Sequence, residues 1–388
     1  MNWISFLHLY QPANIDIAIV KEATLMSYER ILRALEENSS YKVTMNISGC
    51  LLDRWVDELG RNDLIDRLKK LIKSGKIELV GSAAYHCLLP LVSEKEAIKQ
   101  IKEQEVILKK YFGRDLRLAG FFFPEMAYGQ GMAKIIKKLG YEWIIIDQVG
   151  LGPLVNEAPV DVFIDSSSGL KVVVRSRDIS ESYIPVTLGK MIGLMPDAVC
   201  ITACDAELFG LRHLDQTSEY EKFLSNASLK TMCISEYINN QKKHKKQIFR
   251  DCSWQSTDRE LAGNILFSLW SDPKNKIHQD LWQLATLAQE IEQNKPVGEN
   301  FNWCRWHLVR GLASCAWWWS SSYDFRGVFG PVAWSPDEIE RGINDLIRSI
   351  RASESLTSIA TKLLAEDLAL NIRKKIWHQH WTKHYAGK

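Results

Sequence analysis

Short apolar runs alternate with amphipathic stretches over the first 240 residues of the chain. The apolar runs are brief and in several cases β-branched, which is typical of strands that are covered on both faces. They predict seven strands, at residues 3–9, 42–48, 77–83, 116–123, 143–146, 171–176 and 198–203. The stretches between them predict helices at 20–37, 53–74, 94–111, 131–139 and near 218–241. This alternation indicates a parallel sheet with right-handed crossovers.

Seven strands are one fewer than a complete β/α barrel has. We therefore predict an α/β fold with an incomplete seven-stranded parallel barrel, and a doubly wound sheet is the alternative. After residue 257 only helical periodicity is found, at 258–270, 278–293, 301–320, 336–352 and 355–375. The predicted domains are a catalytic barrel at 1–250 and a helical domain at 251–388, which packs on the barrel and completes its cleft.

Composition narrows the possible functions. The chain has 388 residues and a net charge of +2 with mixed signs throughout, so no broad basic surface for nucleic acid is expected. No apolar run is long enough for a membrane span, and the N-terminus lacks a basic leader segment. The eight cysteines are scattered without a C-x-x-C pair, which favours reduced thiols in the cytoplasm. The 14 tryptophans suit both a packed core and a carbohydrate site.

Four of the predicted strands end in polar or ionisable residues. The first ends at His8, the third leads to His86, the fourth to Glu125, and the seventh to Asp205 and Glu207. The carboxyl ends of parallel barrel strands form one mouth, where active sites lie. A structural role is an equal alternative for each histidine. Glu125 follows three phenylalanines and a proline, a context that favours a functional acid over an incidental surface acid.

Two carboxyl groups across one mouth can cleave a glycosidic bond. In a retaining mechanism they lie about 5 to 5.5 Å apart, one as nucleophile and one as general acid/base. We expect Glu125 to attack the anomeric carbon and Asp205 to protonate the leaving oxygen and later activate water. A second negative charge at Glu207 would help to raise the pKa of Asp205, although Glu207 could also point away.

Five segments, in order, resemble the sequence regions of glycoside hydrolase family 57. They are HLYQP, GSAAYHCLLPL, GFFFPEMAYG, CDAELFG and SSSYDF, spread over about residues 1 to 330. The resemblance implies a retaining enzyme that acts on α-glucans, with an incomplete seven-stranded barrel, a helical region and no cofactor. It places the nucleophile at Glu125 and the acid/base at Asp205.

The resemblance also implies substrate-contacting residues, and two positions depart from the family pattern. It places these contacts at His8, His86 and Asp324, and we expect further substrate contacts from Gln11, Glu207, Tyr323, Trp254 and Trp270. Tyr10 stands where the family usually has a second histidine, and Tyr323 stands where it often has tryptophan. Both differences concern substrate preference rather than bond chemistry. CDAELFG and PEMAYG are closest to branching enzymes, but the short segment between the two acids favours an amylase-like or glucanotransferase-like enzyme.

Three alternatives stay open. Histidines and aspartates at strand ends could bind a metal, as in polysaccharide deacetylases or zinc-dependent mannosidases, with His8, His86, Asp147 and Asp205 available. The chain could instead be a non-catalytic α-glucan-binding protein, although such a protein has no need for the acid pair. The basic and aromatic tail at 373–388 could contact nucleic acid, but a helix that packs Ile376, Trp377 and Trp381 onto the bundle is the preferred interpretation.

Overall fold

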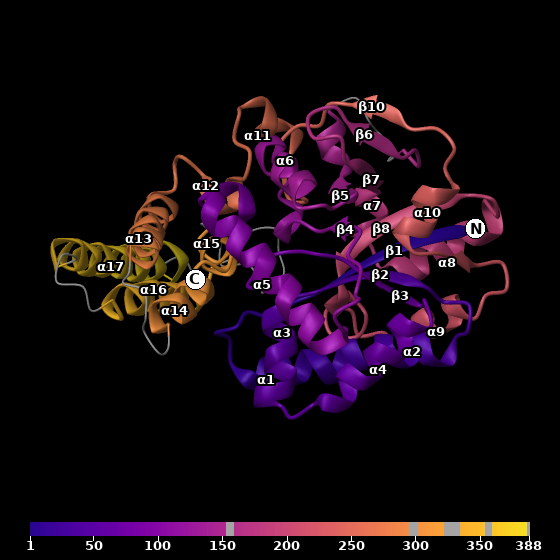
Figure 1. The fold of residues 1–388 in the computed structure, drawn as a ribbon, viewed down its shortest axis with the longest axis horizontal. Helices are drawn as coiled ribbons and strands as arrows, with labels where there is room; N and C mark the ends of the chain where they lie inside the picture. Colours follow the sequence, from indigo (N-terminus) through magenta and orange to yellow (C-terminus); the bar gives the residue numbers. More distant parts are fainter. Residues whose placement is uncertain (153–158, 295–301, 322–333, 354–358, 386–388) are drawn as a thin grey trace. The chain divides into compact units, whose positions relative to one another are not determined.

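The computed structural model describes residues 1–152, 159–294, 302–321, 334–353 and 359–385 (Figure 1). The chain falls into two compact units. The first contains Met1–Gln11, Asp16–Ala84 and Ile101–Trp254, and the second contains Pro12–Ile15, Tyr85–Gln100 and Gln255–Lys388. Two early segments thus join the C-terminal part, which the sequence did not indicate. The predicted packing of a helical domain against a barrel stays a prediction.

Two parallel sheets form the centre of the first unit, and their neighbouring strands are seen side by side in Figure 1. The first has the order β3-β2-β1-β8, made of Ile77–Leu79, Val43–Ile47, Asn2–Leu9 and Val199–Asp205. The second contains β7, β5 and β4 as adjacent strands, made of Lys171–Arg175, Trp143–Asp147 and Gly120–Phe121. All five pairs of neighbouring strands within these two runs are parallel.

The two sheets are linked at both edges. Gly81, just after β3, forms a parallel bridge with Phe121 of β4. At the other edge, the N–H of Ser176, just after β7, donates to the carbonyl of Ile201 in β8 at 2.8 Å. The seven strands therefore follow one another as β1-β2-β3-β4-β5-β7-β8. The contacts of β3 with β4 and of β7 with β8 are single bridges or hydrogen bonds rather than full strand pairings. The predicted seven-stranded incomplete barrel is confirmed, strand by strand.

Three further short strands were not expected from the sequence. They are β6 at Phe163–Asp165, β9 at Lys230–Thr231 and β10 at Lys245–Gln247. β6 runs antiparallel to β7 and parallel to β10. β6 and β10 thus extend the second sheet beyond β7 and are not among the seven barrel strands. These segments have only two or three residues, and β9 and β10 are polar, so they carry no strand periodicity.

Helices connect the strands at the predicted places. The stretch 20–37 contains α1 (Ile17–Ala23) and α2 (Glu29–Glu37) around a π-helical turn. The other expected helices appear as α3 (Gly49–Asp53), α4 (Asn62–Lys73), α5 (Glu94–Phe112) and α6 (Gln130–Lys138). In α4 the buried residues Leu64, Ile65, Leu68 and Leu71 form one face, as the 3.6-residue period requires.

The segment near 218–241 is two short helices rather than one. They are α9 (Glu219–Leu224) and α10 (Ile234–Asn240), separated by β9. Two helices between β7 and β8 were missed altogether: α7 (Arg177–Ser180) and α8 (Ile184–Leu194). α8 contains Gly189, Gly193 and Pro185, which suppress the helical signal in the sequence.

Apolar side chains from most of the strands fill the first unit. Its core cluster includes Phe6 of β1, Phe122 after β4, Trp143 of β5 and Ile201 of β8, each at most 3% exposed. Phe6 and Phe122 lie with ring centroids 5.0 Å apart. Because the strands are covered on both faces, their sequences are nearly continuous apolar runs, as the pattern indicated.

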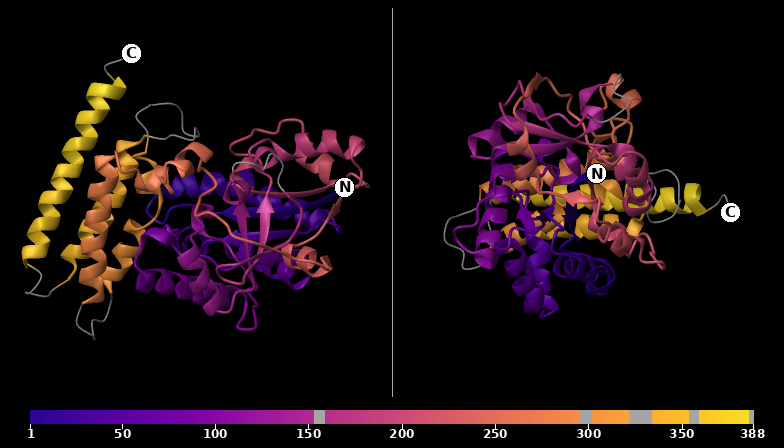
Figure 2. Two further views of the ribbon diagram at one scale, coloured as in Figure 1. Left: turned by 90° about the horizontal axis from the view of Figure 1, so that it is seen from above. Right: turned by 90° about the vertical axis from the view of Figure 1, so that its right-hand side faces the viewer.

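The second unit is helical in all of its regular described segments beyond residue 255. Its helices are α11 (Asp258–Ala262), α12 (Ser268–Ser271), α13 (Lys276–Gln293), α14 (Trp303–Gly311), α15 (Cys315–Trp318), α16 (Pro336–Arg351) and α17 (Ile359–Gln379). α13, α16 and α17 pack against one another, and Figure 2 shows α17 beside α13. In the tail, Ile376 is fully buried, as predicted, whereas Trp381 is 55% exposed, so its predicted packing is wrong.

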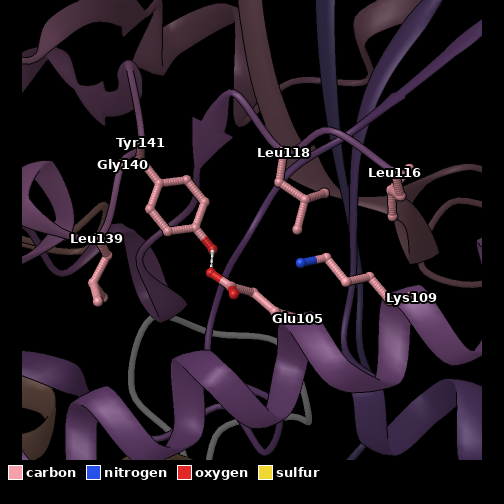
Figure 3. A pocket seen from close by; sticks show the side chains of 7 residues that line it. All are labelled: Glu105, Lys109, Leu116, Leu118, Leu139, Gly140 and Tyr141. Atoms are coloured by element: carbon pink, nitrogen blue, oxygen red, sulfur yellow. Dashed lines mark hydrogen bonds between the residues drawn. The ribbon is translucent and has the colours of Figure 1, made fainter. Parts of the chain in front are cut away.

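A small pocket lies at the amino ends of β4 and β5 (Figure 3). Glu105 and Lys109 of α5 line one side, and Tyr141 donates a hydrogen bond to Glu105 at 2.8 Å. The carboxyl ends of the strands carry the predicted acids, so this pocket belongs to the opposite edge of the sheet.

Two further expectations can be compared with the structure. All eight cysteines lie outside disulfide bonds, and seven of them are buried, as their scattered spacing suggested. Among the helices that the structure describes, none combines the length and the apolar character needed to cross a bilayer.

The close contact between Gly120 and Trp143 gives a test of the packing. A β-carbon on Gly120 would lie 2.1 Å from Cζ2 of the buried Trp143 ring. Gly120→Ala should therefore lower the free energy of unfolding by about 1–3 kcal/mol. Gly189→Ala in α8 is the matched control, because its new methyl group meets no atom within 4 Å. It should leave stability unchanged or raise it by up to about 1 kcal/mol. Equal urea midpoints for the two variants would contradict this packing.

Candidate active site

The pairing of β1 with β8 brings two of the predicted site residues together. The strands are parallel, and His8 is the register partner of Asp205. On the other side of β1, His8 is the register partner of Asn46 in β2. The Nδ1–H of His8 donates to Oδ1 of Asn46 at 2.8 Å, which orients the ring. Burial lowers the pKa of His8, against the opposing effects of Asp205 and Asn46, so the imidazole is neutral at neutral pH.

Glu125 lies in a tight turn directly after β4. Pro124–Met126 form a single 3₁₀ turn, in which Glu125 has φ 60° and ψ 18° and Met126 has φ 47°. Left-handed backbone costs a glutamate on the order of 1–2 kcal/mol and persists only where neighbouring contacts fix it. Such strain occurs preferentially at functional sites.

The segment 252–254 provides those contacts. Tyr128 and Cys252 exchange two backbone hydrogen bonds of 2.8 and 3.1 Å, and the N–H of Trp254 donates to the carbonyl of Glu125 at 3.2 Å. The indole Nε1–H of Trp254 also donates to Oε2 of Glu125 at 3.0 Å. Trp254 therefore holds both the backbone and the carboxylate of Glu125. Arg175 in turn lies over the indole ring, with its guanidinium carbon 5.4 Å from the ring centroid.

A short series of side chains joins Glu125 to Asp205 within the first unit. The Trp254 indole, bonded to Glu125, lies edge-on to the His8 ring with centroids 6.3 Å apart. His8 is adjacent to Asp205 through the strand register. Phe122 lies next to both rings, with its ring centroid 4.8 Å from that of His8 and 6.0 Å from that of Trp254. Glu125 thus contacts one ring of this series, Trp254, and Asp205 is the register partner of the other, His8.

Asp205 also has a cationic partner. Nη1 of Arg212 donates to Oδ2 of Asp205 at 2.7 Å. Burial opposes the charge of Arg212, but the negative charges of Asp205 and Glu207 outweigh it and raise the pKa of the guanidinium. Arg212 was not expected from the sequence, although it lies in the same segment as both acids. Its backbone N–H donates to the Glu207 carbonyl at 2.7 Å, which folds it back toward Asp205.

Glu207 is enclosed by protein groups. Its side chain points inward, and the residue is only 4% exposed. Its Oε1 accepts the hydroxyl of Tyr28 and, at 2.8 Å, the amide Nε2–H of Gln11. Burial first and the charge of Asp205 second raise the pKa of Glu207 to about 7. The group with the raised pKa is thus Glu207, and the effect of Glu207 on Asp205 stays a prediction.

Asp147, at the end of β5, is held by two arginines. Its carboxylate oxygens lie 2.6 Å from Nε of Arg175 and 2.7 Å from Nη2 of Arg177. Asp147 and Asp205 therefore both serve as partners of guanidinium groups, which accounts for them without a metal. In the described part of the chain, no group of three His, Cys, Asp or Glu side chains is arranged to hold a metal ion.

His86 belongs to the second unit. It has φ 61°, its Nδ1 lies 3.0 Å from the Ser314 hydroxyl, and its carbonyl accepts the Ser314 N–H at 3.0 Å. Trp270 is in the same unit, only 1% exposed, and its carbonyl accepts the indole N–H of Trp282. Tyr323 and Asp324 lie outside the described residues. The predicted substrate contacts of these four residues stay predictions.

Three residues of the site were missed from the sequence: Tyr28, Asn46 and Arg212. Asn46 and Ser48 are polar residues near the end of the apolar run 42–48. A polar residue at the end of a strand is a signal that could have revealed Asn46. Tyr28 lies in a helical stretch of mixed polarity. Its contact with Glu207 joins positions 179 residues apart, so the local pattern contains no indication of it.

The chain is similar to proteins of one enzyme family. The sequence model of glycosyl hydrolase family 57 matches residues 9–250, more than half of the chain. An α-amylase of Pyrococcus horikoshii is 33% identical over 147 residues, which cover 38% of this chain and 22% of that protein. A 4-α-glucanotransferase of Thermococcus litoralis is 26% identical over 267 residues, covering 62% of this chain and 38% of the relative. The chain thus matches well under half of the length of these two curated relatives.

Solved structures show the same fold. A GH57-type branching enzyme from Pyrococcus horikoshii superposes with a TM-score of 0.70 at 13% identity, covering 97% of this chain and 95% of that one. The Thermococcus litoralis 4-α-glucanotransferase also gives 0.70, at 18% identity, with 90% and 60% coverage. At such identities the likeness concerns the fold.

The state of Glu207 predicts how stability depends on pH. Its pKa is raised in the folded protein from the ordinary value of 4.5 to about 7, so between these values only the folded state keeps the proton. Stability should therefore fall as pH rises through this window. Glu207→Gln cannot lose a proton, and its free energy of unfolding relative to wild type should rise by roughly 2–3 kcal/mol from pH 4.5 to pH 8.

Glu221→Gln is the control for this series. Hydrogen bonding to Arg30 lowers the pKa of Glu221, so its effect on stability is complete above pH 4.5. The difference between this variant and wild type should stay constant from pH 5 to pH 8. Chemical denaturation at several pH values measures both differences, and a flat result for Glu207→Gln would show that the buried acid is already ionised.

Proposed function

The chain belongs to glycosyl hydrolase family 57, and from that premise we propose that it cleaves α-1,4-glucans with retention of anomeric configuration. Glu125 is the proposed nucleophile and Asp205 the proposed general acid/base. The observation that carries this proposal is the link between them: Trp254 bonds the Glu125 carboxylate and lies against His8, the register partner of Asp205.

The proposed reaction has two displacements. In the first, the Glu125 carboxylate forms a bond to the anomeric carbon, the glycosidic bond breaks, and Asp205 gives its proton to the leaving oxygen. In the second, Asp205 takes a proton from water, which attacks the anomeric carbon and releases Glu125. The N–H of Trp254 supports this role because it fixes one carboxylate oxygen of Glu125 in a defined direction.

Neutral His8 suits a position beside the sugar. Burial lowers its pKa, and its bond to Asn46 fixes which nitrogen carries the proton. A neutral ring adds no positive charge near the oxocarbenium-like transition state. We propose that His8 contacts the sugar bound between the two acids. Gln11 contributes indirectly, by its hydrogen bond to Glu207.

Transfer to a sugar hydroxyl is the alternative outcome of the second displacement. The same pair would then act in a 4-α-glucanotransferase or a branching enzyme, names that several relatives carry. What decides between water and sugar is the binding of the acceptor glucan. A chain that binds glucan without cleaving it is a further alternative. The presence of both Glu125 and Asp205 does not favour it, because binding alone has no need for an acid pair.

The proposed location is the cytoplasm. The eight free cysteines, seven of them buried, support a compartment in which thiols stay reduced. The proposed partner is an α-glucan or maltooligosaccharide. The net charge of +2, with both signs mixed along the chain, does not favour binding to nucleic acid.

Incubation with maltotriose tests the proposal. Wild type should release reducing ends, and the products separate the alternatives: only shorter sugars indicate hydrolysis, whereas longer ones indicate transfer. Glu125→Gln should lower kcat by about 10³-fold or more, because the covalent step is lost. Asp205→Ala should be similarly slow on maltotriose.

Azide provides the control that separates the two roles. A small anion can replace either missing carboxylate, but from opposite faces of the sugar. With an activated maltosyl substrate, azide should rescue Glu125→Ala to a β-glycosyl azide and Asp205→Ala to an α-glycosyl azide. If wild type and both variants are equally inert while all bind glucan, the chain is a binding protein and the proposed activity is wrong.

A further inference from the structure

The two proposed catalytic acids belong to different sheets of the barrel. Glu125 follows β4 of the second sheet, whereas Asp205 ends β8 of the first sheet. Around the barrel, each path from one acid to the other crosses a join where the strands share single bridges or hydrogen bonds rather than a full pairing. The separation of the two carboxyl groups is therefore set at these joins, and a retaining mechanism works only within a narrow range of separation.

The join between β7 and β8 is held by side chains. The carbonyl of Ala203 in β8 accepts a hydrogen bond of 2.8 Å from Nη1 of Arg175, the last residue of β7. The N–H of Ala203 donates to the hydroxyl of Ser180 in α7 at 3.1 Å. Both backbone groups of Ala203, two residues before Asp205, are thus bonded to side chains from the end of β7 and the helix after it.

The same guanidinium also holds the partner of Glu125. Nη2 of Arg175 donates to the Trp254 carbonyl at 3.3 Å, and the guanidinium lies over the indole ring. Its Nε donates to Asp147, at the end of β5, at 2.6 Å. Three nitrogens of one side chain, which is only 3% exposed, therefore bond three separate segments of the chain. A planar guanidinium can do this, whereas the single ammonium group of a lysine cannot reach all three in the same geometry.

We propose that Arg175 is a positioning residue that fixes the separation of the two catalytic carboxyl groups. Through Ala203 it is bonded to the strand that ends at Asp205. Through Trp254 it is bonded to the residue whose indole N–H holds Glu125. It acts through these neighbours rather than on the sugar. The inference rests on the proposed function, because it concerns the spacing that the two displacements need.

Loss of the Arg175 guanidinium should move Glu125 together with its surroundings. The turn of Glu125 is closed by backbone hydrogen bonds from segment 252–254, and its carboxylate is bonded by the Trp254 indole. Neither contact involves the side chain at position 175. What changes is the distance from this group to Asp205, and a displacement of about 1 Å at a reacting centre can cost on the order of 10²-fold in rate.

Two reactions separate the spacing of the acids from the state of Glu125 alone. Cleavage of maltotriose needs both carboxyl groups, because the leaving oxygen takes a proton from Asp205. With α-maltosyl fluoride and azide, Glu125 displaces fluoride, azide then bonds to the anomeric carbon and releases Glu125, and no proton is transferred. Arg175→Lys should lower kcat for maltotriose by about 10- to 100-fold and change KM by less than about threefold. The fluoride reaction should slow by less than about threefold.

Two further variants identify which half of the link is lost. Trp254→Phe keeps an aromatic ring beside Arg175 but lacks the N–H that bonds Glu125, so both reactions should slow alike. Ser180→Ala removes the other side-chain contact of Ala203 without changing any charge. It should repeat the pattern of Arg175→Lys with a smaller loss, and it decides the question if Arg175→Lys does not fold.

Arg30→Lys is the matched control. Arg30 is another forked guanidinium of the first unit, and its Nε and Nη2 donate to Glu221 and Asp215, each at 2.7 Å. The change from arginine to lysine should lower the stability of this variant as well, but both reactions should keep their wild-type rates.

The inference and the proposed function fail in different ways. An equal loss of both reactions in Arg175→Lys would show that this residue acts on Glu125 or on the whole fold, and would overturn the inference while leaving the glycosidase intact. Unchanged cleavage of maltotriose in folded Arg175→Lys, or in Ser180→Ala where the lysine variant does not fold, would overturn it as well. If wild type acts on neither substrate, the proposed function is wrong and the inference falls with it.

Discussion

The parallel pairing of β1 with β8 is the constraint on which the candidate site depends. It joins the N-terminal strand to a strand nearly 200 residues later, and its register places His8 beside Asp205. A shift of one residue would turn Asp205 to the other face of the sheet and break its relation to His8. The register is secured by apolar residues such as Phe6 and Ile201, which pack in the common core. The packing of apolar residues in the core thus determines the position of the Asp205 carboxyl group.

Each carboxyl group described in the site has a cation or hydrogen-bond donors beside it. An isolated charge removed from water costs several kcal/mol, so such partners are required wherever a carboxylate is buried. Asp147 has two arginines, Asp205 has Arg212, and Glu207 has a tyrosine and an amide. Arg175 connects Asp147 with Trp254, since it bonds the first and lies over the ring of the second. Through Trp254, the orientation of Glu125 is therefore linked to the ion pair of Arg175 with Asp147.

The sequence predicts the scaffold of this protein far better than the shell around its acids. All seven barrel strands follow from apolar runs, because a strand buried on both faces has a local signature. His8, Glu125 and Asp205 follow from their places just after such runs. Asn46 has the same kind of signal as His8, a polar residue at the end of an apolar run, but was overlooked. Tyr28 and Arg212 have no such signal, since their roles arise from a contact between distant segments and from a fold-back of the chain. For the same reason the pattern failed at α8, where glycines interrupt a helix that the surrounding structure holds, and at Trp381, whose aromatic character alone suggested packing.

The position of Trp254 matters for any attempt to dissect the chain. It is the last residue of the first unit, and the residues just before it hold the turn of Glu125 by backbone hydrogen bonds. A fragment that stops at residue 250, where composition and periodicity change, would contain both acids and every barrel strand. It would nevertheless lack the indole that orients Glu125 and the Cys252 backbone that closes its turn. Such a fragment could keep its secondary structure and still lose the left-handed geometry of its nucleophile, so circular dichroism would report it as intact.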